Sequence, residues 1–384
     1  MTMVADPPAR TGSPSGPLAD GPDPLAGVDA IVAQLAELRP VVLVERAADA
    51  SAGMLVIPAQ AAGPDQINFM AKHCRGLVIL ALTPERVAAL RLPPMVEHNN
   101  ALYQQGFTTS IEARTGVSTG ISAADRARTI HVAIDSDFGP DDIVTPGHVF
   151  PVTGRNGGVL ARPGFTEASL ELMQRAGCQN AAVLCAILDA DGALADMAGL
   201  TVFARRHGLR IGAIDDLVET RLHEEPLLEP AGRRGFTSRR GGSWELRGFR
   251  NRIDGSFQLA LVKGRLAGLR ADDPVPLRVH ALSLLDDVLE REGSGKDRLG
   301  HMMDGMAGAE RAIIVLVRDD AGLFPFDEVD QRQKAYPMPR LGPAAIAAKI
   351  LLQLGVVSVR LHDSACDLAD TLASYGIAQE GHHG

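Results

Sequence analysis

The sequence predicts an α/β protein with two folded domains. Short runs rich in Val, Ile and Leu alternate with helical patterns along most of the chain, which is typical of a mixed α/β sheet domain. The length of 384 residues allows two or three domains with large cores. Aromatic residues make up only 4% of the chain, so Val, Leu, Ile and Ala must build those cores.

The first domain is expected over residues 28–221. Before it, residues 1–27 are rich in Pro, Gly, Ala and Asp and predict a disordered tail. The domain opens on a helical pattern at 28–38, and further helical patterns lie at 65–74, 122–133, 166–176 and 193–207. Strand-like runs between them lie at 41–45, 54–58, 77–81, 108–113, 181–188 and 209–214.

A second, smaller α/β domain is expected over residues 241–384. Residues 222–240 contain two prolines and charges at both ends, which predicts a linker. The second domain has a helical pattern at 343–354 and strand-like runs at 257–262, 274–280, 311–317 and 356–361.

Composition excludes several classes of function. The net charge of -9 argues against general affinity for nucleic acid. The four cysteines are scattered without a CxxC pair, which indicates a reducing compartment and no disulfide framework. We see neither a secretory signal pattern nor an apolar run of membrane-spanning length, and therefore expect a cytoplasmic protein without a membrane partner.

Residues 145–168 have the composition of a phosphate-binding loop. A glycine-rich turn, a cation and a helix N-terminus together form an anion site. We take Arg162, Gly164 and Thr166 as the phosphate-binding candidates, with Thr166 as the N-cap of a helix and Gly177 as its stop. The alternative is a capped helix after an ordinary loop, and composition supports both interpretations equally. Five glycines lie in this segment: Gly147, Gly154, Gly157, Gly158 and Gly164.

His148 lies in the same segment, in the run PGHVFP, which we interpret as part of the loop. An isolated histidine is more often structural than catalytic, but this one neighbours the phosphate candidate. It could act there as a general acid or base.

Three other charged groups have simpler interpretations. In the segment 115–130, Ser122 or Asp125 could cap a helix and Arg126 could reach an anion, but a solvated Asp–Arg pair is favoured. The acidic cluster at 135–142 lacks the Gly and Glu placement of a calcium loop and is interpreted as a solvated turn. The arginines between 233 and 252 alternate with aromatic residues, as in single-strand or nucleotide sites, but a solvated linker beside a domain edge is favoured.

Four runs of the first domain resemble 3,4-dihydroxy-2-butanone 4-phosphate synthase of riboflavin biosynthesis. They are TGISAADRARTI, PGHVFP, GGVLARPGFTEAS and AAVLCAILDADG, and the similarity extends over about 40–220. The second half is similar, more weakly, to GTP cyclohydrolase II, through PLRVH at 276–280 and the segment 341–361. The whole chain thus resembles the fused bifunctional enzyme of that pathway, and the resemblance implies a homodimer.

The resemblance implies a lyase that converts ribulose 5-phosphate to dihydroxybutanone phosphate and formate with magnesium. This sequence departs from the family at the reacting positions. The two metal-ligand positions are Ala50 and Phe165, the essential acidic position is Ala186, and Met54 stands where a sugar-binding Asp is expected. Family residues that remain are His148, Arg162, Gly164, Thr166, Glu167, Asp125 and Arg126.

The second domain departs from its family as well. That family holds zinc with three cysteines, yet Ser283 occupies the first position and no cysteine lies between 186 and 365. The segment 320–325 takes the place of the family's GRNIGL. We therefore expect neither zinc nor GTP cyclohydrolase II activity.

Three functions follow from these residues. The first is a homologue without the family activity, a pseudoenzyme, that binds a phosphorylated sugar or a pathway partner. The second is an active lyase whose ligands come from elsewhere in the pocket, for instance Glu45 or Asp49. The third is a repurposed, metal-free enzyme that uses His148 and Glu167 on another ligand. As chemistry the first is favoured, with no metal in the first domain.

Overall fold

The computed structural model describes residues 25–46, 51–101, 105–270, 272–283, 287–289, 298–318, 339, 341–362 and 366–380. These residues form two compact units. One contains the described residues up to Asp216, and the other contains those from Leu217 onward. The second unit also includes two short earlier segments, of which 156–163 precedes the helix of the predicted phosphate loop. Most of the predicted tail, residues 1–24, lies outside the described residues, as do Asp49 and Ala50.

The first unit is built on a mixed sheet, which confirms the predicted fold class. Its strand order is β4-β6-β3-β7-β2-β1-β8, and β5 pairs with β6. β1 pairs with β8, and β3 with β6, in parallel, whereas β7 is antiparallel to both β2 and β3. The strands are β1 (Val41–Arg46), β2 (Ser51–Pro58), β3 (Arg75–Leu82), β4 (Gly106–Phe107), β5 (Ile111–Ala113), β6 (Ile143–Thr153), β7 (Ala181–Ile187) and β8 (Ile211–Ala213).

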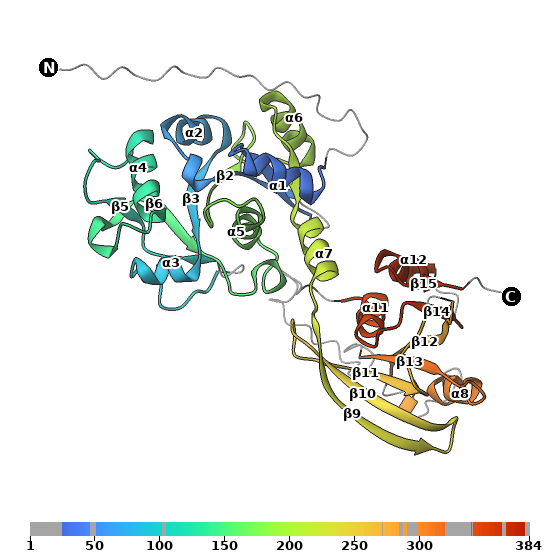
Figure 1. Ribbon diagram of the computed structural model, residues 1–384. Helices are drawn as coiled ribbons and strands as arrows, with labels where there is room; N and C mark the ends of the chain where they lie inside the picture. The colour runs from blue at the N-terminus through green and yellow to red at the C-terminus, as the bar shows by residue number, and fades with distance from the viewer. Residues whose placement is uncertain are drawn as a thin grey trace. The chain divides into compact units, whose positions relative to one another are not determined.

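Helices cover both faces of this sheet (Figure 1). One face carries a core that includes Leu55, Val183, Ile67, Ile130 and Leu200, from strands β2 and β7 and helices α2, α4 and α6. On the other face α1 packs against α5, and α5 contacts β2, β3 and β7. The helices are α1 (Val28–Ala36), α2 (Pro64–Phe69), α3 (Pro84–Ala89), α4 (Ala123–Ile134), α5 (Phe165–Arg175), α6 (Met197–His207) and α7 (Ile214–Glu224).

The helix ends follow from local chemistry. Ser122 caps α4, because its Oγ accepts a hydrogen bond from the backbone N of Asp125 at 3.0 Å. Gly177 follows the end of α5 with φ +66, the left-handed backbone that favours glycine at a helix stop. Thr166 is not the N-cap that we predicted: Gly164 already has the extended cap conformation, so the helix begins at Phe165.

The run PGHVFP is also not a loop. Residues 146–151 lie within β6, where Ile111 of β5 pairs with Val149 and Phe150 pairs with Ile79 of β3. The ladder with β5 shifts register at this point, because Ile111 pairs with Val149 whereas Glu112 pairs with Val144. Residues 145–148 therefore bulge between these two pairs, and His148 lies in the bulge.

The second unit contains a sheet of order β15-β14-β12-β13-β11-β10-β9. Its strands are β9 (Leu228–Ser238), β10 (Gly242–Asn251), β11 (Phe257–Lys263), β12 (Val275–Leu282), β13 (Ala312–Arg318), β14 (Ser358–Leu361) and β15 (Ala378–Gln379). Its further helices are α8 (Arg298–Gly305), α11 (Pro343–Gln353) and α12 (Cys366–Ser374). Trp244 of β10 joins Leu261, Met303 and Ile314 in the core on one face of this sheet.

The segment 222–240 is not the irregular linker that we predicted. It contains the end of α7 and all of β9, which forms a long hairpin with β10 (Figure 1). Residues 229–237 of β9 are all exposed, since β9 is an edge strand. Solvent on both faces removes the alternation of apolar and polar residues that identifies a strand in a sequence.

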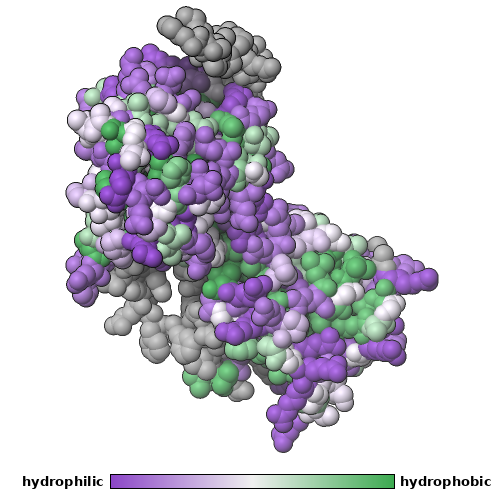
Figure 2. Space-filling view, turned by 60° about the vertical axis from the view of Figure 1, so that its left-hand side comes forward, coloured by the Kyte–Doolittle hydropathy of each residue, from purple (hydrophilic) through white to green (hydrophobic). Residues whose placement is uncertain are grey.

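Among the helices in the described part of the chain, none combines the length and the apolar character that crossing a lipid bilayer requires. Hydrophilic side chains cover much of the face seen in Figure 2, with smaller hydrophobic patches between them.

Replacing Gly147 by alanine should destabilise the first unit, because β5 crosses β6 at this residue. A Cβ on Gly147 would lie 2.1 Å from the carbonyl of Ile111, so the strands must move apart. We expect the free energy of unfolding to fall by about 1–3 kcal/mol, as for other overpacked sites. The control is Gly139→Ala, where a Cβ meets nothing within 4 Å. Chemical denaturation that shows equal stability for the two variants would contradict this packing.

Candidate functional site

A histidine–carboxylate pair lies at the junction of β5 and β6. His148 Nδ1 is 2.9 Å from Glu112 Oε2. The His148 side chain is 42% exposed, whereas that of Glu112 is only 14% exposed. A carboxylate at Nδ1 favours the tautomer in which Nε2 accepts protons. The pair can therefore act as a general base on a ligand at the surface of the sheet.

Glu112 was not among the residues that the sequence singled out. It lies 36 residues before His148, in a strand of only three residues. The strand pairing of β5 with β6 brings the two side chains together, and no local motif signals that pairing.

Asp125 organises the loop that packs against Glu112. Its carboxylate accepts hydrogen bonds from Ser118 N at 3.2 Å, Ser118 Oγ at 2.7 Å and Gly120 N at 3.0 Å. Gly120, with φ +83, lies so close to Glu112 that a Cβ there would come within 2.0 Å of the Glu112 carboxylate. Through the loop 118–120, Asp125 thus helps to position Glu112. The substrate-binding role that we predicted for Asp125 stays a prediction.

Hydrogen bonding also sets the charge of Asp125. The Ser118 hydroxyl, followed by the backbone N–H groups of Ser118 and Gly120, stabilises the carboxylate and lowers the pKa of Asp125 below its ordinary value, against the opposing effect of burial. The carboxylate is therefore ionised throughout the neutral range.

Glu167 ties the predicted phosphate loop to α5. It is only 1% exposed, and its Oε1 accepts a hydrogen bond from the backbone N of Arg155 at 3.0 Å. This contact anchors the loop to α5, and the catalytic role predicted for Glu167 stays a prediction. Thr166 is likewise buried, as the second residue of α5.

Arg162 is 5% exposed, and its backbone N donates to Gly158 O at 3.1 Å. It follows a short helical turn at Gly158–Leu160, which begins after Gly157 with φ +96. Gly157 and Gly158 both have left-handed backbone, so this part of the loop depends on glycine. Two residues, Pro163 and Gly164, separate Arg162 from Phe165 at the start of α5.

The family positions for reacting groups are apolar. Met54 of β2 and Ala186 of β7 are directly paired across the antiparallel ladder. By strand alternation both side chains lie on the face opposite Leu55 and Cys185, which belong to the core beneath α2, α4 and α6. Phe165 is the half-buried first residue of α5. Asp49 and Ala50, the remaining positions of interest, lie outside the described residues.

No metal-ligand cluster exists among the residues that the structure describes. Nowhere in them do three or more His, Cys, Asp or Glu side chains gather in a way that could hold an ion. In the second unit, Ser283 donates its backbone N–H to Asp287 at 2.8 Å, and Asp287 also lies 2.8 Å from His280 Nε2. A buried histidine–carboxylate pair thus lies beside the position of the first zinc cysteine. The segment 320–325 lies outside the described residues.

Comparison with known proteins identifies two matching families. Residues 29–220 match 3,4-dihydroxy-2-butanone 4-phosphate synthase, and residues 230–381 match GTP cyclohydrolase II. A 3,4-dihydroxy-2-butanone 4-phosphate synthase from Neisseria meningitidis is 38% identical over 312 residues, which cover 80% of this chain and 85% of the relative. The riboflavin biosynthesis protein RibBA of Aquifex aeolicus is 37% identical, with 80% of each chain covered.

Solved structures resemble the chain over both units. The crystal structure of RibBX, a two-domain 3,4-dihydroxy-2-butanone 4-phosphate synthase from A. baumannii, has a TM-score of 0.69 and 32% identity, and covers 93% of this chain and 100% of its own. A 3,4-dihydroxy-2-butanone 4-phosphate synthase in complex with two magnesium ions has a TM-score of 0.50 and 33% identity, and covers 51% of this chain and 96% of its own.

Asp125→Asn should lower the thermal midpoint at neutral pH, because the amide cannot accept the hydrogen bonds of residues 118–120 as an ionised group does. Since folding lowers the pKa of Asp125, the carboxylate stabilises the protein above its ordinary pKa, and this contribution disappears as pH falls through the lowered value. Melting curves of wild type and variant should therefore converge in acid. The exposed Asp137→Asn is the control; a pH-independent difference for Asp125→Asn would contradict this account.

Proposed function

The chain belongs to the 3,4-dihydroxy-2-butanone 4-phosphate synthase family and continues into a GTP cyclohydrolase II domain, and on this basis we propose that it binds a phosphorylated sugar without catalysing the family's metal-dependent reaction. It is a riboflavin-pathway homologue by these matches. The observation that carries the proposal is the pairing of Met54 with Ala186 at positions where the family places reacting groups.

The chemistry of the family explains why these residues matter. Forming an enediolate from a phosphorylated ketose requires a base for the carbon-bound proton and a cation for the developing oxyanion. Magnesium takes oxygen ligands, and neither the methyl group of Ala186 nor the ring of Phe165 supplies one. The described residues at these positions do not fit the ion, so we derive no step through it.

The phosphate end of the loop supports binding. α5 is an 11-residue helix whose N-cap, Gly164, makes no side-chain cap hydrogen bond to the first turn. The helix dipole favours negative charge at this end. Arg162 lies in the same loop by sequence and supplies a cation of fixed charge.

One observation favours a second function. The contact between His148 and Glu112 retains an acid–base pair although the metal-ligand positions are apolar. A base oriented by a half-buried carboxylate can move a proton on a bound ligand without a metal. A repurposed, metal-free enzyme is therefore the second candidate, with Glu112 rather than Glu167 as the partner of His148.

Purified protein supplied with magnesium and ribulose 5-phosphate should release no formate, because Ala186 and Phe165 supply neither the carboxylate nor the metal ligand that the family uses for enolisation. Formate can be measured with a coupled dehydrogenase, and a relative with the family residues serves as the positive control. Turnover that disappears in His148→Ala would instead establish an active lyase.

Arg162→Ala should weaken binding of ribulose 5-phosphate by about 1.5–3 kcal/mol, the value of a lost charge-assisted hydrogen bond. Isothermal titration calorimetry measures the affinity, and Arg162→Lys separates loss of charge from loss of packing. Arg175→Ala, at the opposite end of α5, is the matched control. Equal affinities of wild type and Arg162→Ala would rule out this phosphate site.

A further inference from the structure

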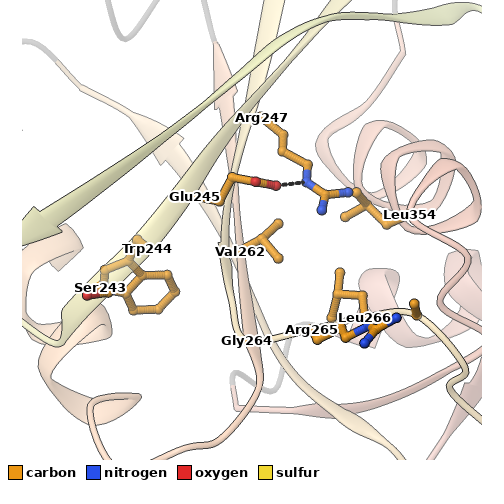
Figure 3. A pocket seen from close by; sticks show the side chains of 10 residues that line it. Ser243, Trp244, Glu245, Arg247, Val262, Gly264, Arg265, Leu266 and Leu354 are labelled. Atoms are coloured by element: carbon orange, nitrogen blue, oxygen red, sulfur yellow. Dashed lines mark hydrogen bonds and ion pairs between the residues drawn. The ribbon is translucent and has the colours of Figure 1, made fainter.

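The second unit contains an open cavity of about 540 Å³. β10 and β11 form its floor, and Leu354 at the end of α11 forms one side (Figure 3). Glu245, Arg247 and Val262 line the floor, and Arg265 and Leu266 follow β11. Ser283, at the former zinc-ligand position, is not among the lining residues.

Trp244 and Ser243 lie at one edge of the cavity, and Glu245, Arg247 and Val262 lie on the face of the sheet opposite the Trp244 core. Trp244 packs with Met303 and Met306, while Glu245 and Arg247 alternate with Trp244 and Leu246 along β10. In Figure 3 the ring of Trp244 lies well away from Arg247, and the Arg247 guanidinium lies between Glu245 and Leu354. The cavity thus has charged groups at Glu245 and Arg247 and apolar groups at Val262 and Leu354.

Positive charge exceeds negative charge at this cavity. The Nε of Arg247 donates to Glu245 at 2.5 Å, and Glu245 is the only acidic side chain in the lining. The strand register places Arg233 of β9 directly opposite Arg247. Like charges in such a pair destabilise a sheet unless an anion joins them. Within the described part of the chain, Arg233 and Arg265 take part in no ion pair, although the protein as a whole carries a net charge of -9.

We propose that this cavity binds a small organic anion with a flat apolar body. The phosphate or sulfonate group contacts Arg247 and Arg265, whose forked guanidinium groups suit such oxygens. The apolar body lies against Val262, Leu266 and Leu354. The volume is in the range of small-molecule sites, which combine apolar walls with a few polar groups. This site has no lining residue in common with the sugar-phosphate site proposed around Arg162 and the start of α5, and neither proposal depends on the other.

The test is calorimetric titration of the full chain with 2-naphthyl phosphate and with 2-naphthol, two probes that share a ring system and differ in the phosphate. We expect saturable binding of the phosphate at one site per chain, and binding of the naphthol weaker by about tenfold or more, since a charge-assisted contact is missing. Arg265→Ala should lower the affinity for 2-naphthyl phosphate by a similar factor. Glu245→Gln should raise the affinity for 2-naphthyl phosphate, because the Glu245 carboxylate no longer competes for Arg247.

Two controls locate the site. Arg239 lies in the exposed turn between β9 and β10 and does not line the cavity, so Arg239→Ala should leave the affinity within about twofold of wild type. Arg162→Ala should leave it unchanged. Equal binding of the two probes, no saturable binding, weaker binding in Glu245→Gln, or an equal loss in Arg239→Ala or Arg162→Ala would each overturn the proposal.

Discussion

The register of β7 between β2 and β3 is the constraint on which the candidate site depends. It pairs Ala186 with Met54 on one side, and on the other side Gly76 lies so close that a Cβ there would come within 2.4 Å of the Ala186 carbonyl. Because Cys185 faces the core, Ala186 must face the opposite side of the sheet. The same backbone could present a carboxylate at this position. Under our proposal, the absence of the family reaction requires no change of fold, only different side chains at positions that the sheet holds in place.

What remains of the site is held together by packing that runs through several elements. Asp125 folds the loop 118–120, Gly120 packs against Glu112, and Glu112 contacts His148. Each step joins two segments that are distant from the substituted positions in the sequence. These contacts involve neither Phe165 nor Ala186, which supports our proposal that an oriented histidine is present without the family's metal-binding groups.

Much of the fold could be predicted from the sequence, since periodicity, the Ser122 cap and the Gly177 stop are local signals. Two features could not. Glu112 reaches His148 only through the pairing of β5 with β6, which no local pattern encodes. The segment 228–238 forms an edge strand with polar residues on both faces, so its composition matches that of a linker. In both cases tertiary pairing, rather than residue type, determines the structure.

Our central proposal is that the side chains at these positions, and not a rearranged fold, prevent the family's metal-dependent reaction. The most direct test is to restore the family residues at all four positions together, as Ala50→Glu, Met54→Asp, Phe165→His and Ala186→Glu. Magnesium-dependent formate release from ribulose 5-phosphate is then measured. We expect the quadruple variant to gain turnover that wild type lacks, with a dependence on magnesium. Efficient formate release by wild type, or a correctly folded and magnesium-binding variant that remains inactive, would contradict this account.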